Sequence, residues 1–240
     1  MTNSQTIQWK RLAVEGTAIV ASILLAFGID AAWDDRQEQR QERIFLTSLL
    51  ADFIDSRDRI QAALSDHDSY RQSAIQLLDI ADARAAGIDP ATVETALLHV
   101  FHNAKTLNTS NGSLDSLLAS GRLATIRNDQ LRALLASWPS RIADAAEDEV
   151  WILVDMQERA IPYLNSAVAT RNILARDPRV ANYISAASSS DYGALWDDRV
   201  FVNLVLYRIH SEIVVITEIT ELLNGAERII NLIESELTRQ

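Results

Sequence analysis

The chain of 240 residues contains no cysteine. Disulfide bonds, thiolate nucleophiles and cysteine-ligated zinc sites are therefore excluded. Glycine and proline are also sparse, with 7 and 4 residues respectively, while hydrophobic residues make up 48% of the chain. A chain so poor in turn residues does not suit a β-rich fold. These absences predict an all-α protein.

Positive charge is scarce as well. Lysine and arginine number 22 against 33 acidic residues, which gives a net charge of −11. Such an acidic protein is poorly suited to bind the phosphates of nucleic acids, so we expect no nucleic-acid partner. The sequence also lacks a Gly-x-Ser-x-Gly motif, a phosphate-binding loop and a dinucleotide-binding fingerprint. We therefore expect no enzymatic activity, no catalytic residues and no cofactor.

The most informative segment that is present runs from Leu12 to Trp33. As a helix it is long enough to cross a bilayer, which takes about 20 residues. Glu15 and Asp30 lie near its ends, where carboxylates reach water at lower cost than at the midplane. The segment predicts an N-terminal transmembrane helix. A cleaved signal peptide ending near Gly28 and a buried helix of a soluble protein are the alternatives, and the helical period that continues past the segment argues against cleavage.

One face of this helix combines small and acidic residues. The spacing of its small residues is the one that lets two membrane helices approach closely. We interpret the face as a surface for a homo-oligomer or a membrane protein partner, in addition to the lipid bilayer. The same stripe can also arise by chance in an alanine-rich chain. Its members are Glu15, Ala18, Ser22, Ala26, Asp30 and Trp33.

The charges that flank the segment do not fix its orientation. Lys10 and Arg11 precede it, whereas Arg36, Arg40 and Arg43 follow it. A long C-terminal domain is translocated largely regardless of charge. We therefore expect a cytoplasmic N-terminus and an external C-terminal domain. The predicted regions are a tail (1–11), the span (12–33), a charged, solvated helical stalk (34–45) and a long-helix antiparallel bundle (46–240).

Apolar periodicity and capping residues predict the helices of the bundle. The first helix either continues from the span to about residue 86 or breaks near Asp66–Ser69. After it we expect helices at 90–104 and 113–120 and a helix from Asn128 that kinks or splits at Pro139. A long helix at 140–172 with a kink at Pro162 comes next, followed by a short helix from Asp177. After a linker at 188–191, the last helix covers 195–237, and Gly225 could bend it.

The same periodicity predicts which residues face the core. For the helix at 140–172 these are Val150, Leu153, Met156, Ala160, Leu164 and Ala167. For the last helix they are Ile209, Ile213, Ile216, Thr220, Leu223, Ala226, Ile230, Ile233 and Leu237.

Polar clusters give no clear sign of a site. We interpret Asp66-His67-Asp68 as a solvated turn and Glu147-Asp148-Glu149 as the wet face of a helix. His99 and His102 share a helix face and could be two metal ligands, but no third ligand is identifiable and no Glu-x-x-His motif exists. No metal site is therefore predicted.

Two stretches resemble an uncharacterised family of bacterial single-span membrane proteins, a domain of unknown function. The first is Trp33-Asp-Asp-Arg36 after the aliphatic span, and the second is the stretch from Leu114 to Leu131. Departures are Asp34 where that family has Asn and Arg127 where it has Lys. The resemblance implies a helical extramembrane domain and attachment to a membrane, and it implies no activity. Together with the orientation chosen above, we expect the domain in the periplasm at a bacterial inner membrane.

From the residues alone, the second stretch has a structural explanation. A helix ends at Ser120–Gly121, with Gly121 as its left-handed cap, Leu123 and Ile126 fill the core, and Asn128 caps the next helix. A ligand or partner site is the alternative.

Two functions remain open. One is a membrane-anchored interaction or scaffold protein, and the other is a sensor-like periplasmic bundle that binds a small ligand and signals through a separate partner.

Overall fold

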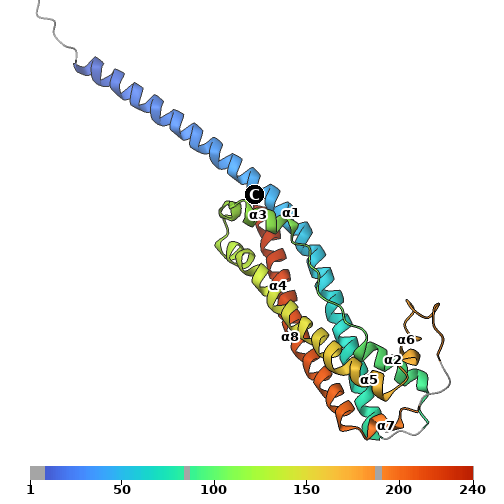
Figure 1. The fold of residues 1–240 in the computed structure, drawn as a ribbon. Coiled ribbons are helices and arrows are strands. Elements are labelled where there is room, and N and C mark those ends of the chain that lie inside the picture. The colour runs from blue at the N-terminus through green and yellow to red at the C-terminus, as the bar shows by residue number, and fades with distance from the viewer. Residues whose placement is uncertain (1–8, 84–86, 187–190, 240) are drawn as a thin grey trace, which may run out of the picture.

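The computed structural model describes residues 9–83, 87–186 and 191–239. Every regular element in these ranges is a helix, so the all-α prediction is confirmed (Figure 1). Three long helices form the body of the molecule, and shorter helices cover its two ends.

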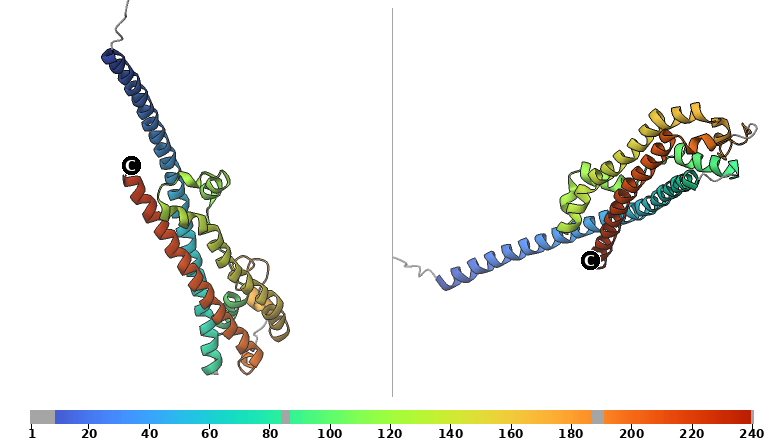
Figure 2. Two further views of the ribbon diagram at one scale, coloured as in Figure 1. Left: turned by 90° about the vertical axis from the view of Figure 1, so that its left-hand side faces the viewer. Right: turned by 90° about the horizontal axis from the view of Figure 1, so that it is seen from below.

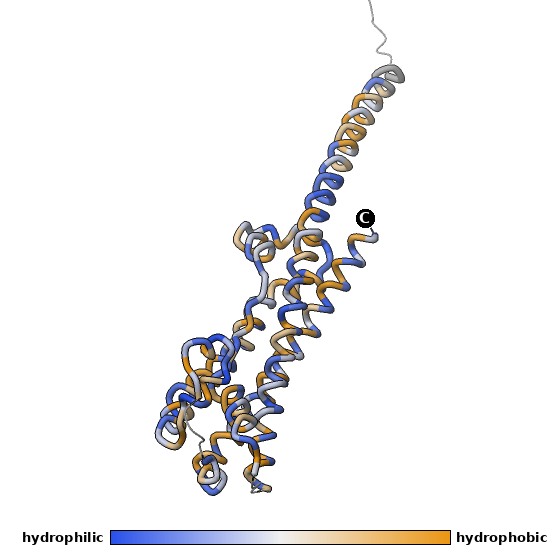
Figure 3. The backbone as a smooth tube through the Cα atoms, turned by 90° about the vertical axis from the view of Figure 1, so that its right-hand side faces the viewer, coloured by the Kyte–Doolittle hydropathy of each residue, from blue (hydrophilic) through white to orange (hydrophobic). Residues whose placement is uncertain are grey.

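Helix α1 (Trp9–Ala83) contains 75 residues, which corresponds to about 110 Å at 1.5 Å per residue. It has no break at Asp66–Ser69, so the continuous alternative is the one observed. The N-terminal part of α1 projects from the body as a single helix, and the remainder packs in the bundle (Figure 1). Figure 3 shows apolar residues concentrated on the projecting part, followed by a polar section before the bundle begins.

Helix α8 (Arg199–Arg239) packs along α1 more extensively than any other element does. The two helices are antiparallel, because Arg43 Nη1 donates to the Leu237 carbonyl at 3.3 Å while His67 Nδ1 lies 2.7 Å from Glu212 Oε2. The C-terminus therefore returns to the end of the bundle from which α1 projects (Figure 2). This arrangement is the antiparallel long-helix bundle that the sequence predicts.

Helix α4 (Asp129–Asp155) is the third long helix and runs antiparallel to α8. It continues through Pro139 without a break, so the predicted split at this residue is wrong. Proline removes one helix hydrogen bond, but Leu135 and Trp138 beside it are both fully buried. Their packing holds the helix together, while Pro139 itself faces solvent.

A π-helical turn, η2 (Met156–Ala160), joins α4 to α5 (Ile161–Ala167). The Ile161 N–H donates to the Met156 carbonyl, one residue further back than in an α-helix. This wider turn directly precedes Pro162, where a second kink is predicted. It keeps both Met156 and Ala160 on the buried side.

Short helices close the two ends of the bundle. At the end far from the projecting part lie α2 (Pro90–Phe101), α6 (Thr170–Leu174) and α7 (Gly193–Trp196). At the near end lie α3 (Gly112–Ala119) and the 3-10 helix η1 (Arg122–Thr125).

Several predicted boundaries are wrong. The helix at 90–104 ends at Phe101, and the one at 140–172 ends at Ala167. Residues 178–183 form turns and not a helix, although the Asp177 carboxylate accepts the Arg179 N–H at 2.9 Å as a helix cap would. The last helix begins at Arg199, where Asp198 accepts the Val200 N–H at 2.7 Å. The predicted linker at 188–191 lies mostly outside the described residues.

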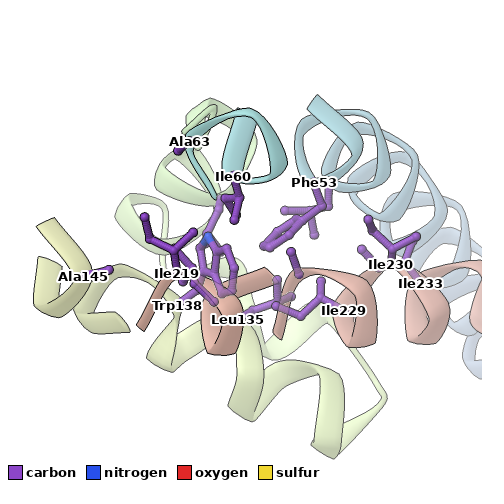
Figure 4. Packing of buried hydrophobic residues seen from close by; sticks show 14 of the residues in the cluster. Phe53, Ile60, Ala63, Leu135, Trp138, Ala145, Ile219, Ile229, Ile230 and Ile233 are labelled. Atoms are coloured by element: carbon purple, nitrogen blue, oxygen red, sulfur yellow. The ribbon is translucent and has the colours of Figure 1, made fainter. Parts of the chain in front are cut away.

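The core consists of two apolar clusters along the bundle. The larger one lies between α1, α4 and α8, and it includes the contact of Phe53 with Trp138, whose ring centroids are 5.1 Å apart (Figure 4). The smaller one lies at the far end, where Phe201 packs against Phe101 and Trp196. The two clusters are separated by a layer of buried polar residues, described below.

Gly121 provides a test of the turn between α3 and η1. Its φ of 68° lies in the left-handed region, and an added Cβ would meet no atom within 4 Å. We expect Gly121→Ala to lower the free energy of unfolding by about 1 kcal/mol through backbone strain alone. Gly112→Ala is the matched control, because this glycine has similar open space and a negative φ; it should be neutral or raise stability by about 0.5 kcal/mol. Urea unfolding of the detergent-solubilised protein measures both, and equal effects would contradict the strain.

Candidate functional site

A layer of charged side chains crosses the core between the two apolar clusters. His67 of α1 is only 2% exposed and lies between two carboxylates. Its Nδ1 is 2.7 Å from Glu212 Oε2 of α8, and its Nε2 is 3.3 Å from Glu149 Oε1 of α4. The histidine therefore joins all three long helices.

Arg208 supplies the second positive charge of this layer. Its Nη2 lies 2.7 Å from Glu212 Oε1, and its Nη1 lies 2.6 Å from the Met156 sulfur. Its guanidinium also sits over the Tyr70 ring, 5.6 Å from the centroid. Two buried carboxylates thus face one guanidinium and one imidazole. We refer to His67, Glu149, Arg208 and Glu212 as the buried charge cluster.

The surroundings of His67 favour its protonated form. Burial alone lowers the pKa of an imidazole, but hydrogen bonds and charge attraction from Glu149 and Glu212 outweigh it and raise the pKa of His67 to about 9. At neutral pH the histidine is then an imidazolium, and the cluster carries two positive and two negative charges. This balance meets the general requirement that buried charges be paired.

The cluster also holds the loop that follows α2. Glu149 Oε2 accepts the Leu107 N–H at 2.7 Å, and Arg208 Nη2 donates to the Asn103 carbonyl at 3.3 Å. Further along, the Ser56 hydroxyl of α1 donates to the Ser110 carbonyl and accepts the Ser110 N–H. Asp52 of α1 accepts the Ser113 N–H. The polar loop at 102–111 is therefore fixed against the long helices.

These residues correct two interpretations from the sequence. Asp66-His67-Asp68 is not a solvated turn, because it lies inside α1 with His67 buried. Glu147–Glu149 is not wholly a wet face, because Glu149 is buried. A prediction from apolar periodicity places polar residues on the outer face of a helix. Where charged residues are buried, the predicted inner face of that helix is therefore rotated away from the observed one.

The two predicted core faces are correct in part. The buried residues among them are Met156, Ala160, Leu164, Ala226, Ile230 and Ile233. Val150 and Ile213, also predicted to face inward, are 51% and 49% exposed, and Ala167 and Thr220 are exposed as well. The sequence did contain one usable signal. Arg208 and Glu212 have i,i+4 spacing on the stripe of Leu204 and Val215, which are buried.

A cavity of about 530 Å³ lies beside the cluster at the far end of the bundle. Tyr70 and Asn103, which contact Arg208, also line this cavity. The rest of the wall comes from α1, α2, the loop after α2 and the turn after α6. Its polar members are Asp66, Ser69, Thr95, His99, His102, Lys105, Arg176, Asp177 and Arg179.

The predicted histidine pair lies in this wall without forming a metal centre. His99 Nδ1 is 3.5 Å from Ser73 Oγ. His102 Nε2 is buried and has no hydrogen-bond partner in the described part of the chain. Burial lowers the pKa of His102, so its ring is neutral at pH 7. No group of three or more His, Asp or Glu side chains among the described residues is placed to hold a metal ion.

The six residues of the predicted span face lie on the projecting part of α1. Glu15, Ala18, Ser22, Ala26, Asp30 and Trp33 are all exposed. The Ser22 hydroxyl donates to the Ala18 carbonyl at 2.8 Å, within its own helix. Association through this face stays a prediction.

Two described helices are long and apolar enough to cross a membrane. The most apolar window of α1 has a mean hydropathy of 1.7 with none of it buried, and that of α8 has 1.5 with 33% buried. Because α8 forms part of the core, α1 is the better candidate.

The two stretches that carry the family resemblance meet in space. Arg127 Nη2 lies 2.5 Å from Asp35 Oδ1, and the Arg127 N–H donates to Glu42 Oε1 at 2.8 Å. Glu42 is 1% exposed, so the predicted stalk at 34–45 is only partly solvated. The stretch from Leu114 to Leu131 is thus docked on α1 where α1 enters the bundle.

The structural explanation of this second stretch agrees with the structure at Asn128, Ile126 and Gly121, and only in part at Leu123. Asn128 Oδ1 accepts the Leu131 N–H at 2.9 Å, which caps α4, and its Nδ2 donates to Glu236 of α8 at 2.7 Å. Ile126 is fully buried, whereas Leu123 is only partly buried against the larger apolar cluster. The Ser120 N–H bonds the Ser116 carbonyl at the end of α3, and Gly121 follows it as the left-handed cap.

Comparison with known proteins gives no match: no protein-family model, no curated protein and no solved structure matches this chain. The resemblance to single-span membrane proteins therefore remains a prediction.

The charge cluster predicts a specific pH dependence. The pKa of His67 is raised from 6.5 to about 9 in the folded protein. Its stabilisation is therefore complete below pH 6.5 and is lost as the pH rises through 9. We expect the free energy of unfolding to fall by about 3 kcal/mol over this range. Urea unfolding at several pH values measures the fall, and His67→Gln should abolish it. The same fall in the variant would show that another group is responsible.

The docking of Arg127 can be tested with two glutamates of α1. Glu42→Ala leaves the Arg127 N–H without the acceptor that it has in the wild type, and we expect the free energy of unfolding to fall by about 1–3 kcal/mol. Glu38→Ala is the control, because Glu38 is 72% exposed and lies 3.6 Å from the Arg127 guanidinium; its effect should stay below about 1 kcal/mol. A loss at Glu38 as large as at Glu42 would contradict this account.

Proposed function

We propose that this chain is a single-span protein of a bacterial inner membrane whose helical bundle acts as a non-enzymatic interaction component. The observation that carries the proposal is the continuity of α1. Its exposed apolar part projects alone, and the same helix then forms one side of the bundle over its whole length. A tether of this kind fixes both the distance and the direction of the bundle relative to the membrane.

The exposed apolar side chains support the membrane part of the proposal. Leu24, Leu25 and Phe27 are 65%, 66% and 67% exposed on the projecting helix. Large apolar residues around a whole helix are typical of a lipid-facing segment. In water the same surface would carry a large hydrophobic cost.

The interaction role is supported by apolar side chains on the bundle itself. Trp151 on α4 and Ile213 on α8 are 62% and 49% exposed. The turn of α1 that faces their region, at His67, lies about 50 Å along the helix from Trp33. At that distance the membrane that holds the span does not cover them, so a protein partner or a second copy of the chain would.

The cavity favours a second function, a ligand-sensing bundle. Its wall shares Tyr70 and Asn103 with the surroundings of Arg208. A ligand bound there would contact α1 directly and α8 through the charge cluster. In this second function the signal would pass to a separate partner.

The membrane anchor can be tested by paired substitutions. Leu24→Arg with Leu25→Arg places two charges in the apolar part of α1, each of which costs about 2.5–3.5 kcal/mol in a membrane helix. We expect the double variant to leave the membrane fraction, as measured by carbonate extraction and immunoblotting. Ile44→Arg with Val150→Arg is the control, because Ile44 and Val150 are also exposed, at 65% and 51%. It should stay in the membrane.

A wild-type chain found in the soluble fraction without detergent would contradict the anchor. Protease added to spheroplasts reads the orientation in the same preparation. Digestion of the bundle is expected for a periplasmic domain, and protection would reverse the proposed orientation.

A further inference from the structure

The polar section of α1 that follows its apolar projecting part (Figure 3) carries its charges on two opposite faces. At 100° per residue, each face covers an arc of about 100°. The first face, which we call the cationic face, is fully exposed and consists of Trp33, Arg36, Gln37 and Arg40. The second face is acidic and consists of Asp34, Asp35, Glu38 and Glu42. Opposite charges are therefore separated around the helix and are not paired along it.

The acidic face is already matched by a cation from another part of the chain. The Arg127 guanidinium lies 2.5 Å from Asp35 Oδ1 and 3.6 Å from Glu38 Oε2. It also lies 3.7 Å from Glu42 Oε2, and Glu42 accepts the Arg127 N–H at 2.8 Å. These carboxylates thus have a partner on the side of α1 that faces away from the cationic face.

The two arginines of the cationic face have no such partner. Neither Arg36 nor Arg40 forms an ion pair or a side-chain hydrogen bond with the described residues. No Asp or Glu stands three or four residues from either of them, whereas Arg59 and Arg159 each pair with an aspartate four residues earlier. Arg36 and Arg40 are instead four residues from each other, and like charges at this spacing destabilise a helix. An anion that contacts both guanidinium groups would remove this repulsion.

The proposed anchor places the cationic face at the surface of the membrane. Trp33 is 64% exposed at the end of the predicted span, and Arg36 and Arg40 lie about 4.5 Å and about 10 Å beyond it along the helix. The headgroup layer extends roughly 5–7 Å beyond the hydrocarbon on each side of a bilayer. Arg36 then lies within this layer, and the long side chain of Arg40 can reach back into it.

We propose that the cationic face binds the phosphate group of an anionic phospholipid in the leaflet that this end of the span reaches. The guanidinium groups of Arg36 and Arg40 donate paired hydrogen bonds to the phosphate oxygens, and Trp33 packs at the boundary between headgroup and acyl chains. The four side chains of the face line a hollow of about 100 Å³, in which the Gln37 amide supplies a further donor. The occupant is a lipid because the face directly continues the lipid-facing part of α1. This assignment rests on the membrane anchor proposed above.

The test is a titration of the full chain in detergent, followed by native mass spectrometry. The probes are phosphatidylglycerol, phosphatidylcholine and inorganic phosphate. Phosphatidylglycerol should bind most tightly, because its headgroup carries a net negative charge and its acyl chains lie against the span. Equal affinity for the two lipids overturns the proposal. Inorganic phosphate that binds as tightly as phosphatidylglycerol would show a site for free anions and would overturn the lipid assignment.

Two double variants test the arginines. Arg36→Gln with Arg40→Gln should weaken phosphatidylglycerol binding by roughly fivefold for each arginine removed and leave phosphatidylcholine binding unchanged. It also removes the repulsion between the two side chains, so the helix should not be weakened. Arg36→Lys with Arg40→Lys keeps both charges and should keep most of the preference. An unchanged preference in the glutamine variant would overturn the site.

Arg57→Gln with Arg59→Gln is the matched control. It removes the same charge from exposed positions of the same helix, about 36–39 Å beyond Trp33. Both arginines already pair with aspartates, Arg57 at 2.7 Å and Arg59 at 2.8 Å. The control should bind phosphatidylglycerol as the wild type does. A loss equal to that of the glutamine variant at Arg36 and Arg40 would assign the effect to overall charge and refute the site.

Carbonate extraction separates this site from the anchor. The variant with Arg36→Gln and Arg40→Gln keeps the apolar part of α1, so it should remain in the membrane fraction. A wild-type chain that is in the membrane without a preference for phosphatidylglycerol refutes this site alone, whereas a soluble wild-type chain refutes the anchor and the site together. A glutamine variant that keeps the lipid preference but loses a protein crosslinked to the wild type would show that the cationic face binds an acidic protein, against the proposal.

Discussion

The structure depends most on a constraint of charge balance inside an apolar core. Glu149 and Glu212 are buried between three helices, and neither would be tolerated there as an unpaired anion. Their charges are matched by His67 and Arg208, which come from two of those helices. Apolar contacts between long helices can slide by a turn at modest cost, but these ion pairs exist in only one alignment. We infer that the charge cluster sets the register of α1, α4 and α8.

The buried charge cluster also explains why the loop after α2 and the cavity lie at the far end of the bundle. The cluster leaves hydrogen-bonding capacity beyond its own ion pairs, and the loop after α2 uses it through Leu107 and Asn103. That loop in turn forms part of the cavity wall, where Asn103 Oδ1 accepts a hydrogen bond from Arg179 at 3.3 Å. Asn103 lines the cavity, and its carbonyl accepts a hydrogen bond from Arg208 of the buried charge cluster. A movement of the cavity wall would therefore reach the cluster through a single residue.

The sequence predicted the fold class and the cap at Asn128, because each depends on local residues. It left open whether the first helix continues through Asp66–Ser69, and the structure shows that it does. It did not predict the charge cluster, because periodicity treats charge as a marker of the surface. Where Glu149 and Arg208 face inward, the predicted apolar face turned outward, as at Val150 and Ile213. The pairing of residues 82 and 145 positions apart, as for His67 with its two glutamates, is a tertiary property that no local pattern contains.

A final consequence concerns how the projecting part of α1 is held relative to the bundle, which matters for the proposed membrane anchor. Between Gly28 and Gly87 the chain has neither glycine nor proline, so α1 has no such hinge residue after Gly28. The short section between Trp33 and the bundle has little packing of its own, and a lone polar helix is only marginally stable in water. The Arg127 side chain contacts this section at Asp35. The Arg127 N–H donates to the buried Glu42, which lies about two helical turns further along α1. The helix is therefore supported where it leaves the bundle, so a displacement of α8 against α1 at the charge cluster would reach the projecting part of α1 as movement of a rod and would not be absorbed by bending.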